Sequence, residues 1–190
     1  MSSWSETDPV ASPSLWWDGL VRGDAHPPLE TDATAQYAIV GGGYTGLWTA
    51  YFLKLIQPDA DIVLVEAQRI GHGASGRNGG WLMGALEGCA AFVDDTGVLP
   101  IAAMQQLTQL VSRAGDVLKK EGIDCDFYHG GCVMAAARHD IQVGRARKML
   151  DDFWRLGFTE DDYHWLTPQE LGERIRVSNP GGAVFTPHVA

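Results

Sequence analysis

The sequence has 190 residues, of which 45% are hydrophobic and 20% are charged. A chain of this length and composition is long enough to form a domain with a hydrophobic core. The net charge is −10, from 24 acidic and 14 basic residues, and this balance argues against duplex nucleic acid or an anionic membrane as the main partner. No apolar run reaches the roughly 18 to 20 residues that a membrane-spanning helix requires, so no membrane span is expected.

The first 35 residues differ in composition from the rest of the chain. They are rich in Ser, Pro, Asp and Thr, and Trp16 and Trp17 provide the one strong apolar anchor. Such a segment does not bury enough apolar surface to form a core of its own. We therefore predict that 1–35 forms an extended arm that lies on the surface of something larger.

A β-α-β pattern follows this arm. Residues 36–40 predict a short buried strand, and a helix is expected over 45–57, where Pro58 ends it. The continuous apolar run within 61–67 predicts a second strand, parallel to the first and covered on both faces. This order of elements is typical of a Rossmann-like unit in an α/β fold.

Between the predicted strand and helix, Gly41, Gly43 and Gly46 form a G-x-G-x-x-G motif. The first glycine permits a tight turn, the second lets the backbone approach a pyrophosphate, and the third lets the helix pack close to the strand. The helix N-terminus then directs N–H groups and a partial positive charge at the phosphates. An ordinary strand-turn-helix without a ligand is the alternative, but the surrounding elements favour a dinucleotide site.

Glu66 lies at the end of the second predicted strand, twenty residues after Gly46. A carboxylate at this place accepts both ribose hydroxyls of an adenosine and repels a 2′-phosphate. The motif therefore suits FAD or NAD and disfavours NADP. A NAD domain usually continues from this strand into another crossover helix, so the next segment bears on the choice between the two cofactors.

That next segment is a second glycine-rich loop, GHGASGRNGGW, over 71–81. Its bare backbone N–H groups, together with the Ser75 hydroxyl, the Arg77 guanidinium and the Asn78 amide, suit a pyrophosphate and the polar edge of a flavin. A flexible surface loop is the alternative interpretation of its composition. The loop favours FAD, and a NAD-dependent dehydrogenase is kept as the less favoured alternative.

The second half of the chain alternates predicted helices and strands. A long helix is expected over 101–120, with Gly122 closing it, because apolar side chains recur at alternating steps of three and four: Met104, Leu107, Val111, Ala114 and Leu118. A strand is predicted over 131–137. A second amphipathic helix is predicted over 140–156, with four inward-facing side chains: Met149, Leu150, Phe153 and Leu156.

The end of the chain carries a helix start and a strand-like segment. Thr167 and Glu170 form a capping box, with Pro168 at the first helical position, and predict a short helix. The last ten residues, GGAVFTPHVA, are apolar and strand-like. We expect the fold to continue beyond them.

The two glycine segments resemble a known family. IVGGGYTGLWTAYFL followed by VLVEAQRIGHGASGRNGGW is similar to the flavin-binding N-terminal half of the glycine oxidase and D-amino-acid oxidase family of FAD-dependent oxidoreductases, in its gamma-glutamylputrescine oxidoreductase-like branch. IDCDFYHGGCVMAAA and GAVFTPH also resemble that branch, so the resemblance covers 14–190. It implies an FAD-binding Rossmann-like segment over 36–100 and the start of an interleaved α+β substrate or cap domain over 101–190.

The resemblance also implies cofactor-binding roles by position. The pyrophosphate would be lined by Gly41, Gly43, Tyr44, Thr45 and Gly46. The adenosine end would be held by Glu66 and Ala67. The pyrophosphate and ribityl chain, toward the flavin ring, would be followed by Ser75, Gly76, Arg77, Asn78, Gly79 and Gly80. Trp81 either reaches that ring or belongs to the core.

The activity implied is oxidation of the C–N bond of a small-molecule amine or amino acid, by transfer of a hydride from the substrate to the flavin. Family members are substantially longer, so this chain is expected to be a truncated N-terminal half. The missing C-terminal half of the same protein would then supply most substrate contacts. A truncated, non-catalytic FAD-binding fragment is the alternative.

The remaining polar and sulfur-containing residues are not assigned to catalysis. His72 is interpreted as a residue without a role in catalysis. For His129 and His188 two interpretations stay open: each either faces the substrate cavity or is an ordinary turn residue. Three cysteines, Cys89, Cys125 and Cys132, form no CxxC pair, and residues 1–20 lack the features of a signal peptide. We therefore expect reduced thiols, no metal site and a cytoplasmic location.

Overall fold

The computed structural model describes residues 14–17, 26–85 and 101–190. The chain divides into two compact units, Met1–Gly80 and Trp81–Ala190, and each is described by itself. Most of the predicted arm, as well as Cys89, lies outside the described residues. None of the helices in the described ranges is long and apolar enough to cross a membrane.

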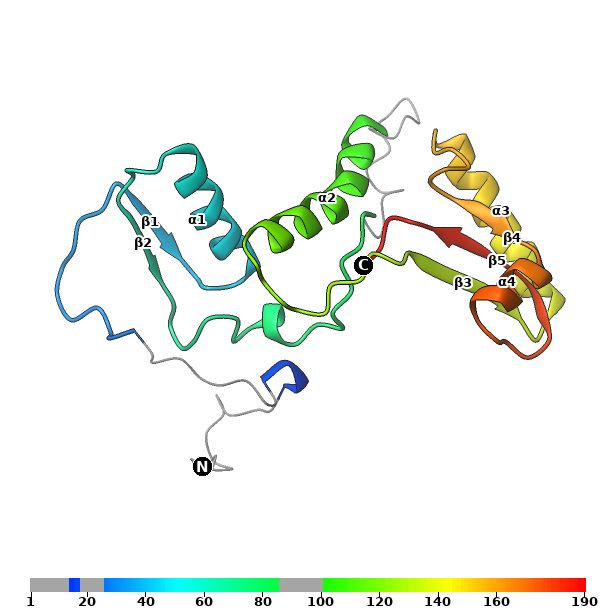
Figure 1. Ribbon diagram of the computed structural model, residues 1–190, viewed down its shortest axis with the longest axis horizontal. Coiled ribbons are helices and arrows are strands. Elements are labelled where there is room, and N and C mark those ends of the chain that lie inside the picture. The colour runs from blue at the N-terminus through cyan, green and yellow to red at the C-terminus, as the bar shows by residue number, and fades with distance from the viewer. Residues whose placement is uncertain (1–13, 18–25, 86–100) are drawn as a thin grey trace. The chain divides into compact units, whose positions relative to one another are not determined.

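The first unit contains the predicted β-α-β pattern. Its elements are a short 3-10 turn η2 (Leu15–Trp17), strand β1 (Tyr37–Val40), helix α1 (Tyr44–Ile56), strand β2 (Ile62–Val65) and a second 3-10 turn η3 (Ala74–Gly76). β1 and β2 pair in parallel, with Tyr37 opposite Ile62 and Val40 opposite Val65. Helix α1 packs on both strands, as Figure 1 shows. The prediction of a parallel pair joined by a helix is confirmed.

The burial of β2 differs from the prediction. All four of its residues are only half-buried, although the continuous apolar run predicted a strand covered on both faces. In the described part of this unit the sheet has two strands, β1 and β2, and α1 is the α-helix that packs on them. A strand is buried on both faces only when elements cover both faces. One helix is too little cover for this strand.

The second unit is an antiparallel sheet with helices. Its elements are helix α2 (Ile101–Lys120), strand β3 (Cys132–Ala137), helix α3 (Asp140–Arg155), strand β4 (His164–Leu166), helix α4 (Pro168–Arg174) and strand β5 (Pro180–Thr186). The strand order is β3-β5-β4, so β5, the last strand in sequence, lies in the middle. Helix α3 packs on β3 and β5, and α4 packs on β5. The helices expected here and the strand expected over 131–137 are present within one or two residues. The strand-like last segment forms β5, which ends at Thr186, and β4 was not predicted.

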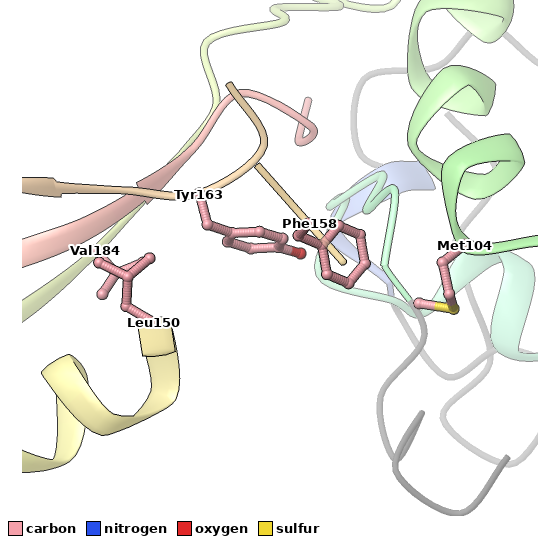
Figure 2. Close-up of a cluster of buried hydrophobic side chains, with 5 residues drawn as sticks. All are labelled: Met104, Leu150, Phe158, Tyr163 and Val184. Atoms are coloured by element: carbon pink, nitrogen blue, oxygen red, sulfur yellow. The ribbon is translucent and has the colours of Figure 1, made fainter. Parts of the chain in front are cut away.

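The core of this unit lies between its helices and the sheet. Figure 2 shows a cluster of five buried side chains: Met104, Leu150, Phe158, Tyr163 and Val184. The other three residues predicted to face inward from α3 pack against this cluster: Met149, Phe153 and Leu156. The rings of Phe153 and Tyr163 stack with centroids 4.2 Å apart. The apolar periodicity of the two long helices therefore identified the sides that face the core.

The capping box predicted before α4 is present. The Thr167 side chain accepts a hydrogen bond from the Glu170 backbone N–H, and the Glu170 carboxylate accepts one from the Thr167 backbone N–H at 2.7 Å. The Thr167 backbone N–H, followed by the Thr167 hydroxyl, which donates to the same carboxylate oxygen at 2.8 Å, lowers the pKa of Glu170. Two donors that the helix would otherwise leave unpaired are satisfied in this way, which fixes where α4 begins.

Candidate functional site

The first glycine turn has the backbone geometry that a strand-to-helix turn requires. Gly41 donates its N–H to the Val65 carbonyl at 2.8 Å and has a φ of 108°, in the left-handed region that favours glycine. A Cβ added to Gly46 would collide with the Gly41 carbonyl oxygen and would lie 3.3 Å from Ile39 Cγ2. The helix and the strand therefore approach one another too closely for any side chain at this position.

Helix α1 begins directly after this turn. Its N-cap is Gly43, which offers no side chain to cap the helix, and the Gly43 carbonyl accepts the Leu47 N–H at 3.0 Å. A thirteen-residue helix carries a partial positive charge at this end. The helix thus presents a positive terminus without a carboxylate of its own to neutralise it.

Glu66 follows β2 and reaches back to the first glycine turn. Its Oε2 accepts the Gly42 N–H at 2.7 Å, and its Oε1 accepts the Gln68 N–H at 3.1 Å. The hydrogen bond from Gly42 is the main cause that holds the pKa of Glu66 below its ordinary value, with Gln68 second. The carboxylate is therefore ionised at neutral pH. Each of its oxygens has a further lone pair with which to accept a hydroxyl.

The second glycine loop lies against the first. Ser75 Oγ accepts the Tyr44 N–H at 3.0 Å, at the first residue of α1. Asn78 donates its Nδ2 to the Tyr44 hydroxyl at 3.1 Å. Gly71 donates its N–H to the Gly42 carbonyl at 2.8 Å. The structure therefore brings together the two segments that the sequence analysis assigned to one cofactor.

Asn78 organises the second loop from within. Its Nδ2 also donates to the Ser75 carbonyl at 2.9 Å, and its Oδ1 accepts the Gly80 N–H at 2.8 Å. The amide was expected to face the cofactor, but these hydrogen bonds commit it to the loop itself. Its backbone carbonyl is engaged as well, by the indole N–H of Trp16 at 2.8 Å.

The other predicted site residues are more exposed. Arg77 donates its Nε to the His72 carbonyl at 3.0 Å, and its side chain is exposed. Thr45 and Ala67 are exposed beside the helix start and the strand end. Trp81, 66% exposed, is the first residue of the second unit, and its prediction as a flavin contact stays a prediction.

The residues present fit a dinucleotide. A Cβ added at Gly41, Gly73 or Gly79 would meet no atom within 4 Å, so bare backbone faces open space at three places in the two loops. The start of α1, which has no acidic residue in its first turn and gives only its first N–H to Ser75, supplies positive potential for a pyrophosphate. The ionised Glu66 supplies acceptors for ribose hydroxyls. Peptide N–H groups and one carboxylate form the donor and acceptor set that FAD requires at its adenosine diphosphate end.

Several residues of this region were not predicted as site residues from the sequence. Gly42, in the first turn, is buried, and an added Cβ there would collide with Ile70 Cδ1 and would lie 3.3 Å from Glu66 Cβ. Ser14, Trp16, Trp17 and Arg69 contact the second loop or one another. The available signal was the pair of tryptophans in an otherwise polar segment, which marked an anchor without showing what it contacts.

His129 and His188, whose roles the sequence did not decide, lie in the second unit. His129 lines an open hollow of about 560 Å³ formed by α2 and the segment after it, together with Cys125 and Phe127. His188 lies 2.9 Å from the Asp162 carboxylate, from its Nε2 to Oδ1. Burial alone would raise the pKa of Asp162, but hydrogen bonds from Thr159 and His188 outweigh it and lower that pKa. Neither histidine lies in the unit that contains the glycine loops.

Comparison with known proteins gives a family match over most of the chain. Residues 36–190 match the model of the DAO family, described as FAD dependent oxidoreductase. The chain is 34% identical over 133 residues to gamma-glutamylputrescine oxidoreductase from Escherichia coli, an alignment that covers 68% of this chain and 30% of that relative.

Solved structures share the fold. Glycine oxidase from Bacillus cereus superposes with a TM-score of 0.60 at 22% identity, over 82% of this chain and 40% of that protein. L-amino acid deaminase from Proteus myxofaciens superposes with a TM-score of 0.62 at 16% identity, over 90% of this chain and 35% of that protein. The chain thus spans less than half the length of each of these relatives.

Proposed function

Because the chain belongs to the DAO family of FAD-dependent oxidoreductases, we propose that its two glycine loops bind FAD for the oxidation of an amine or amino acid. The observation that carries this proposal is the contact between the loops, in which Ser75 accepts the first N–H of α1. A loop that merely connected two elements would have no need to meet a helix N-terminus. Family membership argues against the alternative of a simple NAD-dependent dehydrogenase.

Different parts of the site would hold different parts of FAD. The first turn and the start of α1 would line the pyrophosphate: Gly41, Gly43, Tyr44, Thr45 and Gly46. The N–H groups of Gly41 and Tyr44 are already donated to Val65 and Ser75, so these two residues would act through the shape of the turn. Glu66 and Ala67 would hold the adenosine ribose. The second loop would continue toward the flavin with Ser75, Gly76, Arg77, Asn78, Gly79 and Gly80. Asn78 and Ser75 would act mainly by shaping that loop, since their side chains hydrogen bond within it or to Tyr44.

The substrate class rests on the relatives. Their names specify gamma-glutamylputrescine, glycine and L-amino acids, all of which carry an amine. FAD, when bound, supplies the hydride acceptor for such an oxidation. The side chains of this chain would position FAD and stabilise its charged diphosphate, and we assign no acid or base for the amine. The acidic net charge of −10 favours the approach of a cationic amine.

Turnover is proposed to need more polypeptide than these 190 residues. The chain covers 30% of the Escherichia coli relative and 40% of the glycine oxidase, so most of each relative has no counterpart here. The same coverage supports a second candidate, a fragment that binds FAD without catalysing a reaction. Detection of hydrogen peroxide or of a reduced artificial acceptor, with amine substrates and added FAD, separates the two candidates.

A cytoplasmic, reducing setting is part of the proposal. Cys125 and Cys132 are free thiols in the structure. Burial raises the pKa of the Cys132 thiol, which favours its protonated form. Disulfides are rare in such a compartment, and free thiols are compatible with it.

The direct test of the site is a titration with FAD. In the purified chain, we expect Gly43→Val to abolish FAD binding, because an added Cβ already lies 3.0 Å from Ser75 Oγ and Val adds two methyl groups. Glu66→Ala is expected to weaken binding. Gly144→Val is the matched control, since this exposed glycine of α3 has no atom within 4 Å of an added Cβ. Normal FAD binding by Gly43→Val would contradict the assignment of the site.

A further inference from the structure

The segment Ser14–Trp17, which we name the aromatic turn, lies on the second glycine loop. Ser14 donates its hydroxyl to the Gly76 carbonyl, and Trp16 donates its indole N–H to the Asn78 carbonyl at 2.8 Å. Both hydrogen bonds join residues 62 positions apart in the sequence. The aromatic turn therefore holds two carbonyl groups of the loop, two residues apart.

The two tryptophan rings pack on bare glycine backbone. A Cβ added to Gly80 would lie 2.7 Å from Trp16 Cη2, and one added to Gly76 would lie 3.2 Å from Trp17 Nε1. A Cβ added to Gly71 would lie 3.6 Å from Trp17 Cζ2. The glycines of this loop thus make room for two indoles on one side, in addition to any role toward a ligand.

Trp17 also connects the loop to the end of the sheet. The Arg69 guanidinium carbon lies 4.3 Å from the centroid of the Trp17 ring, within the range of a cation–π interaction. Arg69 follows β2 and precedes the loop. The ring of Trp17 therefore contacts both the start of the connection and the loop that follows it.

These contacts fix the direction of particular peptide groups. The described residues contain no cis peptide bond, and in a trans peptide the C=O and the following N–H point in opposite directions. Because Trp16 holds the Asn78 carbonyl, the Gly79 N–H points away from the aromatic turn. An added Cβ at Gly79 meets no atom within 4 Å, so the backbone there faces open space.

We propose that the aromatic turn is a positioning element for FAD, which holds the second glycine loop in its binding conformation and aims the Gly79 N–H at the cofactor. The proposal rests on the FAD-binding function proposed above. It adds residues outside the two glycine motifs to the machinery of cofactor binding and assigns them a role through the loop that they hold. Loss of the turn would raise the dissociation constant mainly through faster release, because the loop would no longer be held closed around its ligand.

The test compares variants of the aromatic turn in the purified chain. Trp16→Phe keeps a ring and removes the indole donor, and Trp16→Ala with Trp17→Ala removes both rings. Leu15→Ala is the matched control, because Leu15 lies in the same turn and is 78% exposed. The first readout is the FAD dissociation constant and release rate, from the recovery of flavin fluorescence. The second is amide hydrogen exchange of 71–80 without FAD.

We expect the double alanine variant to bind FAD at least about tenfold more weakly, Trp16→Phe to be intermediate, and Leu15→Ala to match the unsubstituted chain. Exchange of the 71–80 amides should accelerate in the double variant while that of β1 and β2, in the same unit, is unchanged, which distinguishes a loosened loop from a misfolded unit. FAD release and exchange rates equal to those of the unsubstituted chain would overturn the proposal. Failure of the unsubstituted chain to bind FAD would overturn the proposed function instead, and accelerated exchange would then show only that the turn holds the loop.

Discussion

At Gly46 a single methyl group would meet the main chain of Gly41, in contact with its carbonyl oxygen. A backbone atom cannot rotate away as a flexible side chain can, so α1 would have to move off β1. We expect Gly46→Ala to destabilise the chain by about 1–3 kcal/mol, the usual cost of overpacking, and to weaken FAD binding. Urea unfolding followed by circular dichroism measures the first effect, and FAD titration measures the second.

Gly144 provides the matched control for that substitution. It too lies within a helix, and an added Cβ there meets no atom within 4 Å. Alanine has the higher helix propensity, so Gly144→Ala is expected to stabilise the chain by about 0.5–1 kcal/mol. If both substitutions changed the free energy of unfolding in the same direction, the close approach of helix and strand would not be the reason for glycine at position 46.

Glu66 gives the site a pH dependence. Its pKa is lowered in the folded protein, mainly by the Gly42 N–H, so its contribution to stability is present above the unfolded pKa of about 4.3 and is lost as the pH falls through the lower, folded value. We expect the stability gap between the unsubstituted chain and Glu66→Gln to be constant above about pH 5.5 and to shrink as the pH falls below about 4.3. Urea unfolding at a series of pH values measures this gap, and a gap independent of pH would contradict the role of the charge.

Residue roles were predictable where they depend on local backbone geometry. The positive φ of Gly41 and the close packing at Gly46 follow from the spacing of the motif. The hydrogen bonds of the Asn78 side chain within its own loop cannot be predicted from that spacing, because they depend on where the loop backbone lies in space. Trp16 and Trp17 were identified as an anchor, but a contact across 62 residues leaves no periodic signal in the sequence.

At the scale of elements, α3 has one side chain on which its packing depends most. Leu150 is 1% exposed and belongs to the core cluster with Val184. We expect Leu150→Ala to lower the free energy of unfolding by about 2–5 kcal/mol, through lost burial and a residual cavity. Ile141→Ala in the same helix is the control, since Ile141 is 61% exposed and its removal is expected to have little effect. Equal effects would mean that the assigned face of α3 is wrong.

The predictability of elements follows their length. Helices α2 and α3 each repeat their apolar pattern over several turns, so their bounds and inward faces were evident. Strand β4 has three residues, His164–Leu166, too few to establish an alternating pattern. Its strand conformation arises from pairing with β5, where Trp165 lies opposite Val184, and that partner is almost twenty residues away in sequence.

At the scale of the whole molecule, the first unit leaves apolar surface uncovered. Large apolar side chains of α1 and β1 are exposed to solvent: Val40, Leu47, Phe52, Leu55 and Ile56. Large apolar side chains exposed to water favour association. We expect the 190-residue chain to be marginally stable and to associate as its concentration rises, in sedimentation velocity or light scattering. Ile56→Lys should reduce that association, and a sharp cooperative melt of a strictly monomeric chain would contradict this expectation.

The function proposed for this chain requires that the two glycine loops form one FAD site. The measurement that tests it most directly is the visible absorption spectrum of the purified chain after incubation with FAD and removal of the unbound cofactor, followed by release and identification of the chromophore. We expect a flavin spectrum and recovery of FAD from the unsubstituted chain, and neither from Gly43→Val. A folded chain that retains no flavin, or one that retains it equally with Val at position 43, would contradict it.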